Sequence, residues 1–319
     1  MNKKLLGIIG VMGLASAGAA AVADKVFNVT CRQTDIQKEK NSDPHIELGS
    51  AQYADINPRM HQLIGEAEKE KFERIEIRSS RDGTPLRARF YRFGDDSETI
   101  IFFHGYRGSA LRDGCGGFKM AKDTKRNILM VDQRASGESG GNVITFGILE
   151  RLDCRDWAEY IADRFPDVKI ILTGVSLGAA TVLMAADTGL PKNVKCIIAD
   201  CGYSSPKEII CKVAKEGGYP VSLCWPLLKL SCKLRAGFDL DESSAVEAVK
   251  HTDIPILIIH GDDDRYVPCD MAYKIYDACA SKKELLIISG APHAAAYMVD
   301  EKAYVETSER FIKECLEEK

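Results

Sequence analysis

The clearest pattern along this chain is a series of short apolar segments that alternate with stretches of helical periodicity. The apolar segments show no regular polar alternation, which is typical of strands buried on both faces of a parallel sheet. The intervening stretches repeat apolar residues every three or four positions, which favours helices packed on that sheet. The predicted strands are Thr99–His104, Asn127–Asp132, Lys169–Val175, Val194–Asp200, Ile256–His260 and Glu284–Ser289, and the predicted helices include Asp153–Phe165, Leu177–Asp187, Asp270–Cys279 and Asp300–Leu316.

Two earlier segments, Phe72–Arg78 and Leu86–Phe93, alternate apolar and polar residues on either side of the sequence RDG at 81–83. That sequence is a turn signal, so the two segments are predicted to pair as an antiparallel hairpin. The chain is therefore assigned to the α/β class, with a mostly parallel central sheet flanked by helices.

One interval between predicted strands, residues 203–250, is too long for a simple crossover. It contains the turn sequence GGYP at 217–220 and a dense apolar stretch after it. We interpret this interval as a helical lid over the carboxyl edge of the sheet, with Trp225 and Leu228 as substrate-binding residues. A plain packing role is the alternative. The predicted inner face of the lid comprises Val221, Leu223, Trp225, Leu227, Leu228 and Leu230.

The N-terminus carries Lys3 and Lys4 before an uncharged run that ends at Ala23. A positive start, an apolar middle and small residues at 21–23 are typical of a secretory signal. An uncleaved anchor is the alternative, because about 19 uncharged residues can just span a bilayer. Both predict a domain that is exported, and either secreted or anchored to the outer face of the cytoplasmic membrane. A domain facing the cytoplasm is the further alternative.

These features divide the chain into three parts. Residues 1–27 are predicted to be the signal peptide or membrane anchor, and the only membrane association that we expect runs through them. Residues 28–71 are predicted to be a polar connector with one short helix from Pro58 to Glu70. Residues 72–319 are predicted to form a single catalytic domain.

Composition excludes several classes of function. The 43 Lys and Arg residues nearly balance the 47 Asp and Glu residues, and no basic stripe interleaves with aromatic residues, so a nucleic-acid partner is not expected. The eleven cysteines include no CxxC pair and the histidines do not cluster, so no metal or cofactor is expected. Most thiols are predicted to be free; an exported chain could join two of Cys211, Cys224 and Cys232.

The sequence GVSLG at 174–178 matches the nucleophile elbow, in which a strand turns sharply into a helix and exposes a serine hydroxyl. A predicted buried strand precedes it and a predicted helix follows. Its glycines remove the Cβ atoms that would collide at so tight a turn. Ser176 is therefore the candidate nucleophile.

A serine hydroxyl needs a general base, and histidine has a suitable pKa. His45, His61 and His251 lie in the connector or before a strand, away from the catalytic edge, whereas His104 and His260 are expected to be buried and bonded to the backbone. Only His293 follows the last predicted strand, in the small-residue loop GAPH at 290–293. We therefore assign His293 as the base.

The acid should follow the preceding strand, because the chain order of the triad on this architecture is serine, acid, histidine. Asp262, Asp263 and Asp264 all lie there, and chemistry alone leaves the choice among them open.

The oxyanion needs two backbone N–H donors. We assign the amides of Leu177, which follows the nucleophile, and Tyr106, in the glycine-rich loop after an early strand. Arg134 at the same edge is expected to pair with an aspartate and hold a loop, with direct substrate contact as the alternative.

Taken together, the motifs FHGYRG at 103–108, VDQR at 131–134, GVSLG at 174–178, IHGDDDRYVP at 259–268 and GAPH at 290–293 resemble the α/β-hydrolase superfamily. The resemblance runs from about residue 70 to the C-terminus. Within it the chain is similar to bacterial serine hydrolases with an N-terminal hydrophobic leader, grouped with serine aminopeptidase-like and esterase/lipase-like members. It implies that Asp264 is the acid, with Asp263 as second choice. Ser136 departs from the family, in which histidine is frequent at that position.

The predicted function is hydrolysis of a carboxylic ester of a small acyl substrate through an acyl-serine intermediate. The alternatives on the same triad are a peptidase or amidase and a thioesterase or acyltransferase. A non-catalytic binding member of the fold is disfavoured because every triad residue is present.

Overall fold

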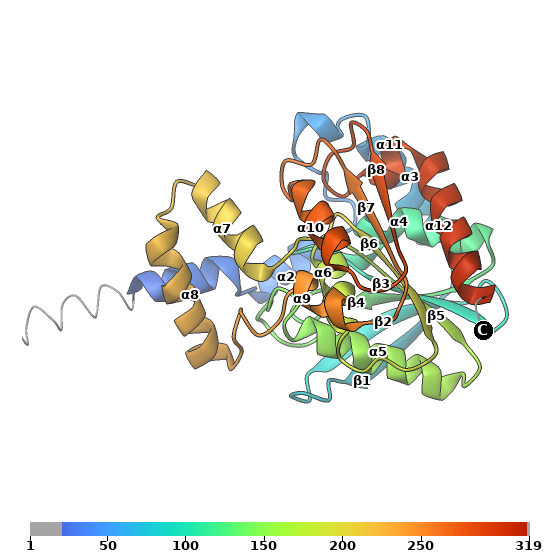
Figure 1. The fold of residues 1–319 in the computed structure, drawn as a ribbon, viewed down its shortest axis with the longest axis horizontal. Coiled ribbons are helices and arrows are strands. Elements are labelled where there is room, and N and C mark those ends of the chain that lie inside the picture. The colour runs from blue at the N-terminus through green and yellow to red at the C-terminus, as the bar shows by residue number, and fades with distance from the viewer. Residues whose placement is uncertain (1–20, 318–319) are drawn as a thin grey trace, which may run out of the picture.

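The computed structural model describes residues 21–317, which contain one eight-stranded sheet (Figure 1). The strands are β1 Glu73–Arg78, β2 Pro85–Tyr91, β3 Glu98–Phe103, β4 Asn127–Asp132, β5 Lys169–Val175, β6 Val194–Asp200, β7 Ile256–Gly261 and β8 Lys283–Ile288. Their order in the sheet is β1-β2-β4-β3-β5-β6-β7-β8. β1 and β2 form the predicted antiparallel hairpin, β2 pairs antiparallel with β4, and the remaining neighbours pair in parallel. The predicted fold class is confirmed.

Neighbouring residues of each central strand point to opposite faces of the sheet, so both faces carry apolar side chains. Helices cover both faces. Ile171 of β5 belongs to one core cluster and Leu172 to the other. The Leu172 cluster includes Trp157 of α5 (Glu150–Arg164), and the Ile171 cluster includes Phe311 of α12 (Glu301–Glu317). With α5 lie α6 (Leu177–Ala185) and α10 (Asp270–Ala278), and with α12 lie α3 (Asn57–Ala67), α4 (Ala110–Asp123) and α11 (Ala296–Val299).

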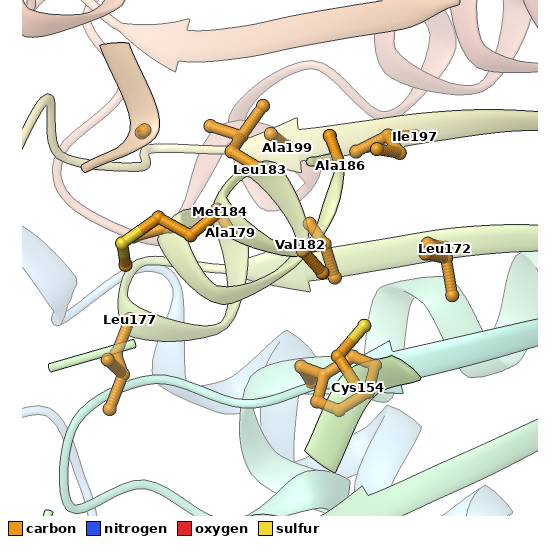
Figure 2. Close-up of a cluster of buried hydrophobic side chains, with 14 of the residues drawn as sticks. Cys154, Leu172, Leu177, Ala179, Val182, Leu183, Met184, Ala186, Ile197 and Ala199 are labelled. Carbon is orange, nitrogen blue, oxygen red and sulfur yellow. The ribbon is translucent and has the colours of Figure 1, made fainter. Parts of the chain in front are cut away.

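Helix α6, which begins directly after the candidate nucleophile, is buried along its whole length. In Figure 2 the helix lies beside the strands that carry Leu172 and Ile197, and its Val182 and Leu183 belong with these residues to one buried cluster. Burial on all sides fixes the start of α6 relative to β5, and so fixes the position of Ser176 between them.

The predicted connector packs more closely than its polar sequence suggests. It contains α2 (Asp35–Ser42), the 3₁₀ turn η1 (Ala51–Tyr53) and α3. Leu63, Ile64 and Ala67 of α3 are completely enclosed in the core beside α4. The apolar spacing within α3 therefore outweighs the polar composition around it.

The interval predicted as a lid forms α7 (Pro206–Glu216) and α8 (Val221–Ala236), followed by α9 (Ala245–Ala248) and the 3₁₀ turn η2 (Val249–His251). Residues 21–30 form a further helix, which we call the N-terminal helix. Figure 1 shows this helix, α7 and α8 together at one end of the molecule, beyond the sheet. Phe27 and Leu228 belong to the same core cluster, so the N-terminal helix packs against α8.

Most of the predicted leader, residues 1–20, lies outside the described residues. Within residues 21–317 no helix is both long enough and apolar enough to cross a bilayer. Residues 21–27, assigned to the leader from the sequence, lie in the N-terminal helix, where Ala23 and Phe27 are buried.

The predicted inner face of α8 is correct only in part. Trp225 and Leu228 face the interior, whereas Leu223 and Leu230 are each 53% exposed. No disulfide joins any of the eleven cysteines, so no pair among Cys211, Cys224 and Cys232 is joined. The Sγ of Cys232 instead lies 3.8 Å from that of Cys31, which follows the N-terminal helix.

Candidate active site

The turn between β5 and α6 has the geometry of a nucleophile elbow. Ser176 adopts φ 57° and ψ −115°, a conformation rarely found outside such strained turns. A Cβ at Gly178 would lie 2.0 Å from the Phe103 carbonyl oxygen, and one at Gly174 would lie 2.3 Å from the Gly178 carbonyl carbon. Only glycine fits at either position, which explains the spacing of the motif.

Three side chains from three separate loops form a continuous hydrogen-bonded chain. The Oγ of Ser176 lies 2.9 Å from Nε2 of His293, and Nδ1 of His293 lies 2.7 Å from Oδ2 of Asp264. A carboxylate only accepts, so Nδ1 carries the proton and Nε2 is free to accept the serine proton. Ser176, His293 and Asp264 are therefore brought together as the sequence and the family resemblance predicted.

Asp264 is held in place by three donors and by a longer contact with His260. Its Oδ1 accepts the backbone N–H groups of Tyr266 and Val267 at 2.9 and 2.8 Å, and its Oδ2 contacts His293 and, at 3.4 Å, Nε2 of His260. Burial alone would raise the pKa of this carboxyl group, but hydrogen bonds from His260 and His293 outweigh burial and hold the pKa well below its usual value. Asp264 is therefore ionised and fixed in orientation.

The two neighbouring aspartates have other partners. Asp262 accepts the backbone N–H of Gly290 at 2.5 Å and so braces the loop that carries His293. Asp263 is half-buried and pairs with Arg265. Neither contacts the imidazole of His293, so Asp264 is the only one of the three aspartates that does.

The other strand-end histidines are structural, as predicted. Nδ1 of His104 donates to the Gly105 carbonyl at 2.8 Å, and its Nε2 accepts the Gln133 backbone N–H at 3.1 Å. Nε2 of His260 donates to the Val267 carbonyl at 2.8 Å. The additional contact of His260 with Asp264 was not foreseen, although its place four residues before the acid was a visible signal.

The loop predicted to supply the second oxyanion donor lies against the nucleophile. A Cβ at Gly105 would be 3.4 Å from the Cβ of Ser176, so the backbone on either side of Gly105 approaches the reacting group closely. The Gly105 N–H donates to Asp113 at 2.8 Å, which fixes the loop. The amide of Leu177 follows Ser176 directly in the chain, and the amide of Tyr106 follows Gly105, which lies close to Ser176.

The side chains of the same loop reach the N-terminal helix. The hydroxyl of Tyr106 donates to the Thr30 carbonyl at 2.8 Å, and the guanidinium of Arg107 donates to the Val29 and Arg32 carbonyls. The last carbonyls of a helix lack partners within it and carry partial negative charge, so a cation there is stabilising. The N-terminal helix is therefore attached to the candidate oxyanion loop, a link with no signal in the sequence.

A second unforeseen contact comes from the connector. The hydroxyl of Tyr53 donates to the backbone carbonyl of His293 at 2.9 Å. Burial raises the pKa of Tyr53 to about 12, so this hydroxyl keeps its proton at any physiological pH. The connector thereby helps to hold the histidine loop.

Arg134 is part of a buried ion pair and does not face the groove. Its guanidinium forms a two-point contact with Asp153, at 2.6 and 2.7 Å, and also pairs with Asp82 at the β1–β2 turn. The structural role expected from the sequence is confirmed, and the alternative of substrate contact is not supported.

An apolar groove of about 550 Å³ lies near the triad, although no triad side chain lines it. Its walls come from the N-terminal helix, α7 and α8, and include Trp225 and Leu228. Its end nearest the triad is formed by Tyr106 and by Tyr266, whose ring centre lies 5.1 Å from that of His293. A volume of this size is typical of a small-molecule site.

Among the described residues, one group of potential metal ligands is compact enough to hold an ion: Cys201, Asp264 and His293. Asp264 and His293 already bond each other, and burial raises the pKa of the Cys201 thiol well above its ordinary value. A protonated thiol is a poor metal ligand, so the geometry fits a proton-transfer pair better than a metal site.

Comparisons with known proteins agree with this geometry. Residues 98–216 match a family model described as alpha/beta hydrolase fold, and residues 159–294 match one described as serine hydrolase. The chain is 27% identical over 223 residues to the uncharacterized protein YqkD of Bacillus subtilis, covering 68% of this chain and 72% of that one. It is also 27% identical over 208 residues to the zebrafish lysophosphatidylserine lipase ABHD12, covering 60% of this chain and 50% of that protein.

Solved structures show the same fold. The Pyrococcus furiosus esterase Pf2001 superposes with a TM-score of 0.64 at 22% identity, covering 78% of this chain and 94% of the esterase. Est1E of Butyrivibrio proteoclasticus, solved with ferulic acid, superposes with a TM-score of 0.56 at 18% identity, covering 76% of this chain and all of Est1E. With its sheet order, its elbow and its matches to both family models, the chain has the α/β-hydrolase fold.

Proposed function

We propose that the protein is an esterase that cleaves carboxylic esters with an apolar acyl chain through an acyl-serine intermediate. The observation that carries the proposal is the hydrogen-bonded chain Ser176–His293–Asp264, near an apolar groove whose lining includes Tyr266, the neighbour of His293. The triad supplies the chemistry, and the groove supplies the space for an acyl chain.

In the acylation half of the proposed cycle, Nε2 of His293 takes the proton of Ser176 while Oγ attacks the ester carbonyl carbon. The carbonyl π electrons move onto oxygen, and the amides of Tyr106 and Leu177 stabilise that charge. When the intermediate collapses, the bond to the alkoxide leaving group breaks and His293 returns the proton to it. The alcohol leaves and the acyl group remains on Ser176.

In the second half, a water molecule repeats the attack. His293 takes one proton from the water, the resulting hydroxide adds to the acyl carbon, and collapse of the intermediate returns that proton to Oγ of Ser176. The acid product then leaves. Asp264 stays ionised throughout, stabilises the imidazolium in both halves and keeps the proton on Nδ1 in the neutral histidine.

The lining of the groove favours an ester of a fatty or aromatic acid over a peptide. Among the described residues none of the lining side chains is acidic, and the charged ones are Lys25 and Arg107. A peptide with a free amino terminus would need a carboxylate there. An acyl group, or an acyl ester with an anionic head, would not. The zebrafish relative is named for a lysophospholipid, which is an ester of that type.

The test is a panel of substrates that share one acyl group and differ in the scissile bond: an oxygen ester, a thioester and an amide. We expect kcat/KM to be highest for the oxygen ester, and Ser176→Ala to lower it to the background rate while the circular dichroism spectrum is unchanged. A faster amide reaction would favour the peptidase alternative. Full ester turnover by a folded Ser176→Ala variant would disprove the proposal.

A further inference from the structure

Helix α8 is apolar on two opposite faces. Trp225, Leu228 and Cys232 repeat at helical spacing and pack inward against the core. Leu223, Leu227, Leu230 and Leu234 also repeat at intervals of four, three and four residues, and so form a second stripe on the opposite side. We call these four leucines the outer stripe.

Three of the four leucines of the outer stripe are exposed to solvent. Leu223 and Leu230 are 53% exposed and Leu234 is 75% exposed, whereas Leu227 is half-buried. Of the twelve strongly exposed large apolar side chains among the described residues, seven belong to the N-terminal helix, α7, α8 or the α7–α8 turn. Exposed apolar side chains gathered in this way mark an interaction surface. The seven are Val22, Val29, Val213, Tyr219 and Leu223, which also line the groove, and Leu230 and Leu234, which do not.

The charge of this end is opposite to that of the rest of the chain. Residues 206–236 contain six Lys and Arg residues and two Glu residues, whereas the whole chain has a net charge of −4. Lys207, Lys215 and Lys233 are exposed. A helix with an apolar stripe flanked by lysines is typical of a segment that lies in the surface of an anionic bilayer.

The direction of the chain supports the same partner. The described residues begin at Ala21, at the end of the molecule that carries α7 and α8 (Figure 1). The sequence before it is uncharged from Leu5 onward. This uncharged segment leads directly into the N-terminal helix, whose Asp24 pairs with Arg235, the neighbour of Leu234 in the outer stripe. The segment and the outer stripe would therefore contact the same lipid surface.

We propose that the end formed by the N-terminal helix, α7 and α8 docks on an anionic lipid bilayer, with the outer stripe of α8 inserted at the level of the head groups. The groove between the same three helices then opens toward the lipid and receives an acyl chain from it. This last step rests on the proposed esterase function; the docking does not.

The experiment is flotation of the full chain with vesicles of phosphatidylcholine alone or with about 30% phosphatidylglycerol, an anionic lipid. Every protein in the experiment carries Leu6→Asp and Ile9→Asp, and the protein with these two changes alone is the parent. The two charges prevent the N-terminal apolar segment from acting as a separate membrane anchor. We expect this parent protein to float with anionic vesicles, and less so in about 0.5 M salt, where charges are screened within a few ångströms.

Two variants then test the surface. Leu230→Ser with Leu234→Ser should lower the vesicle partition coefficient by about tenfold or more, because neither leucine can then be buried in lipid. Lys207→Gln, Lys215→Gln and Lys233→Gln together should remove the preference for anionic lipid. The matched controls are Val299→Ser and Lys302→Gln, exposed residues on α11 and α12, and should have no effect.

None of these residues lines the groove or contacts the triad, so turnover of a short soluble ester should be unchanged in every variant. Absence of flotation by the parent, or flotation unaffected by the leucine variant, would overturn the proposal. The proposal would also be overturned if the protein forms a dimer without vesicles and the leucine substitutions dissociate it, because a second copy of the chain would then cover the stripe. Flotation needs no catalysis, so a protein that floats but hydrolyses no ester would contradict only the proposed function.

Discussion

At the scale of single residues, Asp264 combines more contacts than any other side chain of the triad. Two backbone N–H groups hold one of its oxygens, and His293 and His260 approach the other. The aspartates on its N-terminal side each lack the contact with His293. The role of each aspartate depends on the direction in which its carboxylate points. That direction cannot be predicted from three consecutive aspartates in a sequence.

Replacement of the acid should have a large and specific effect. We expect Asp264→Asn to lower kcat by about 10⁴, because an amide can donate to Nδ1 and so stabilise the wrong imidazole tautomer, as in the well-studied protease example. Asp262→Asn should lower kcat far less. Steady-state kinetics of the variants on one soluble ester measures the difference. If Asp263→Asn loses activity and Asp264→Asn keeps it, the acid is misassigned.

Asp200, at the end of β6, is the residue with the clearest predicted effect of pH on stability. Burial raises its pKa from an ordinary 3.8 to about 6, and its Oδ1 has no hydrogen-bond partner. A carboxyl group whose pKa is raised by folding stabilises the native state below its unfolded pKa. That stabilisation is lost as the pH rises through the folded pKa.

Asp200→Asn should therefore flatten the dependence of stability on pH. Between pH 4.5 and 7.5 the wild type should lose about 2 kcal/mol of unfolding free energy through this group, and the variant should not. Urea unfolding at the two pH values measures the difference. An equal loss in both proteins would mean that Asp200 remains ionised across this range.

At the scale of elements, the bounds of the central strands could be predicted closely. A short uninterrupted apolar run between helical stretches is typical of a strand buried in a parallel sheet. The strands β4, β5 and β6 have the predicted bounds. The orientation of α8 could not be predicted, because leucines occupy both of its faces and composition does not distinguish the buried one. Residues 21–27 were assigned to the leader for a similar reason: small and apolar residues suit a signal peptide and a packed helix equally.

The inner face of α8 should determine the preferred acyl chain. Trp225 and Leu228 line the groove without contacting the triad. We expect Trp225→Ala or Leu228→Ala to shift the chain-length optimum of kcat/KM, while the rate of reaction with a small fluorophosphonate stays nearly constant. Leu234→Ala, on the outer stripe, is the matched control. An unchanged chain-length profile in both groove variants would mean that α8 serves packing only.

At the scale of the whole molecule, the site depends on parts of the chain that are far apart in sequence. The elbow and the histidine loop are placed by the sheet, and their order could be predicted because catalytic loops follow the carboxyl ends of parallel strands. The contacts of Tyr53 with the His293 carbonyl and of Arg107 with the N-terminal helix could not, because each joins surface loops whose approach is determined only by tertiary packing. These contacts connect the N-terminal helix and the connector to the triad.

The central claim is that Ser176 is the one activated nucleophile of this fold, and covalent labelling tests it most directly. The wild type is treated with a fluorophosphonate, digested, and analysed by mass spectrometry to locate the adduct. We predict a single adduct at Ser176, and its slow formation in His293→Ala, where the base is absent. An adduct at another residue, or labelling as fast in His293→Ala as in the wild type, would contradict the account.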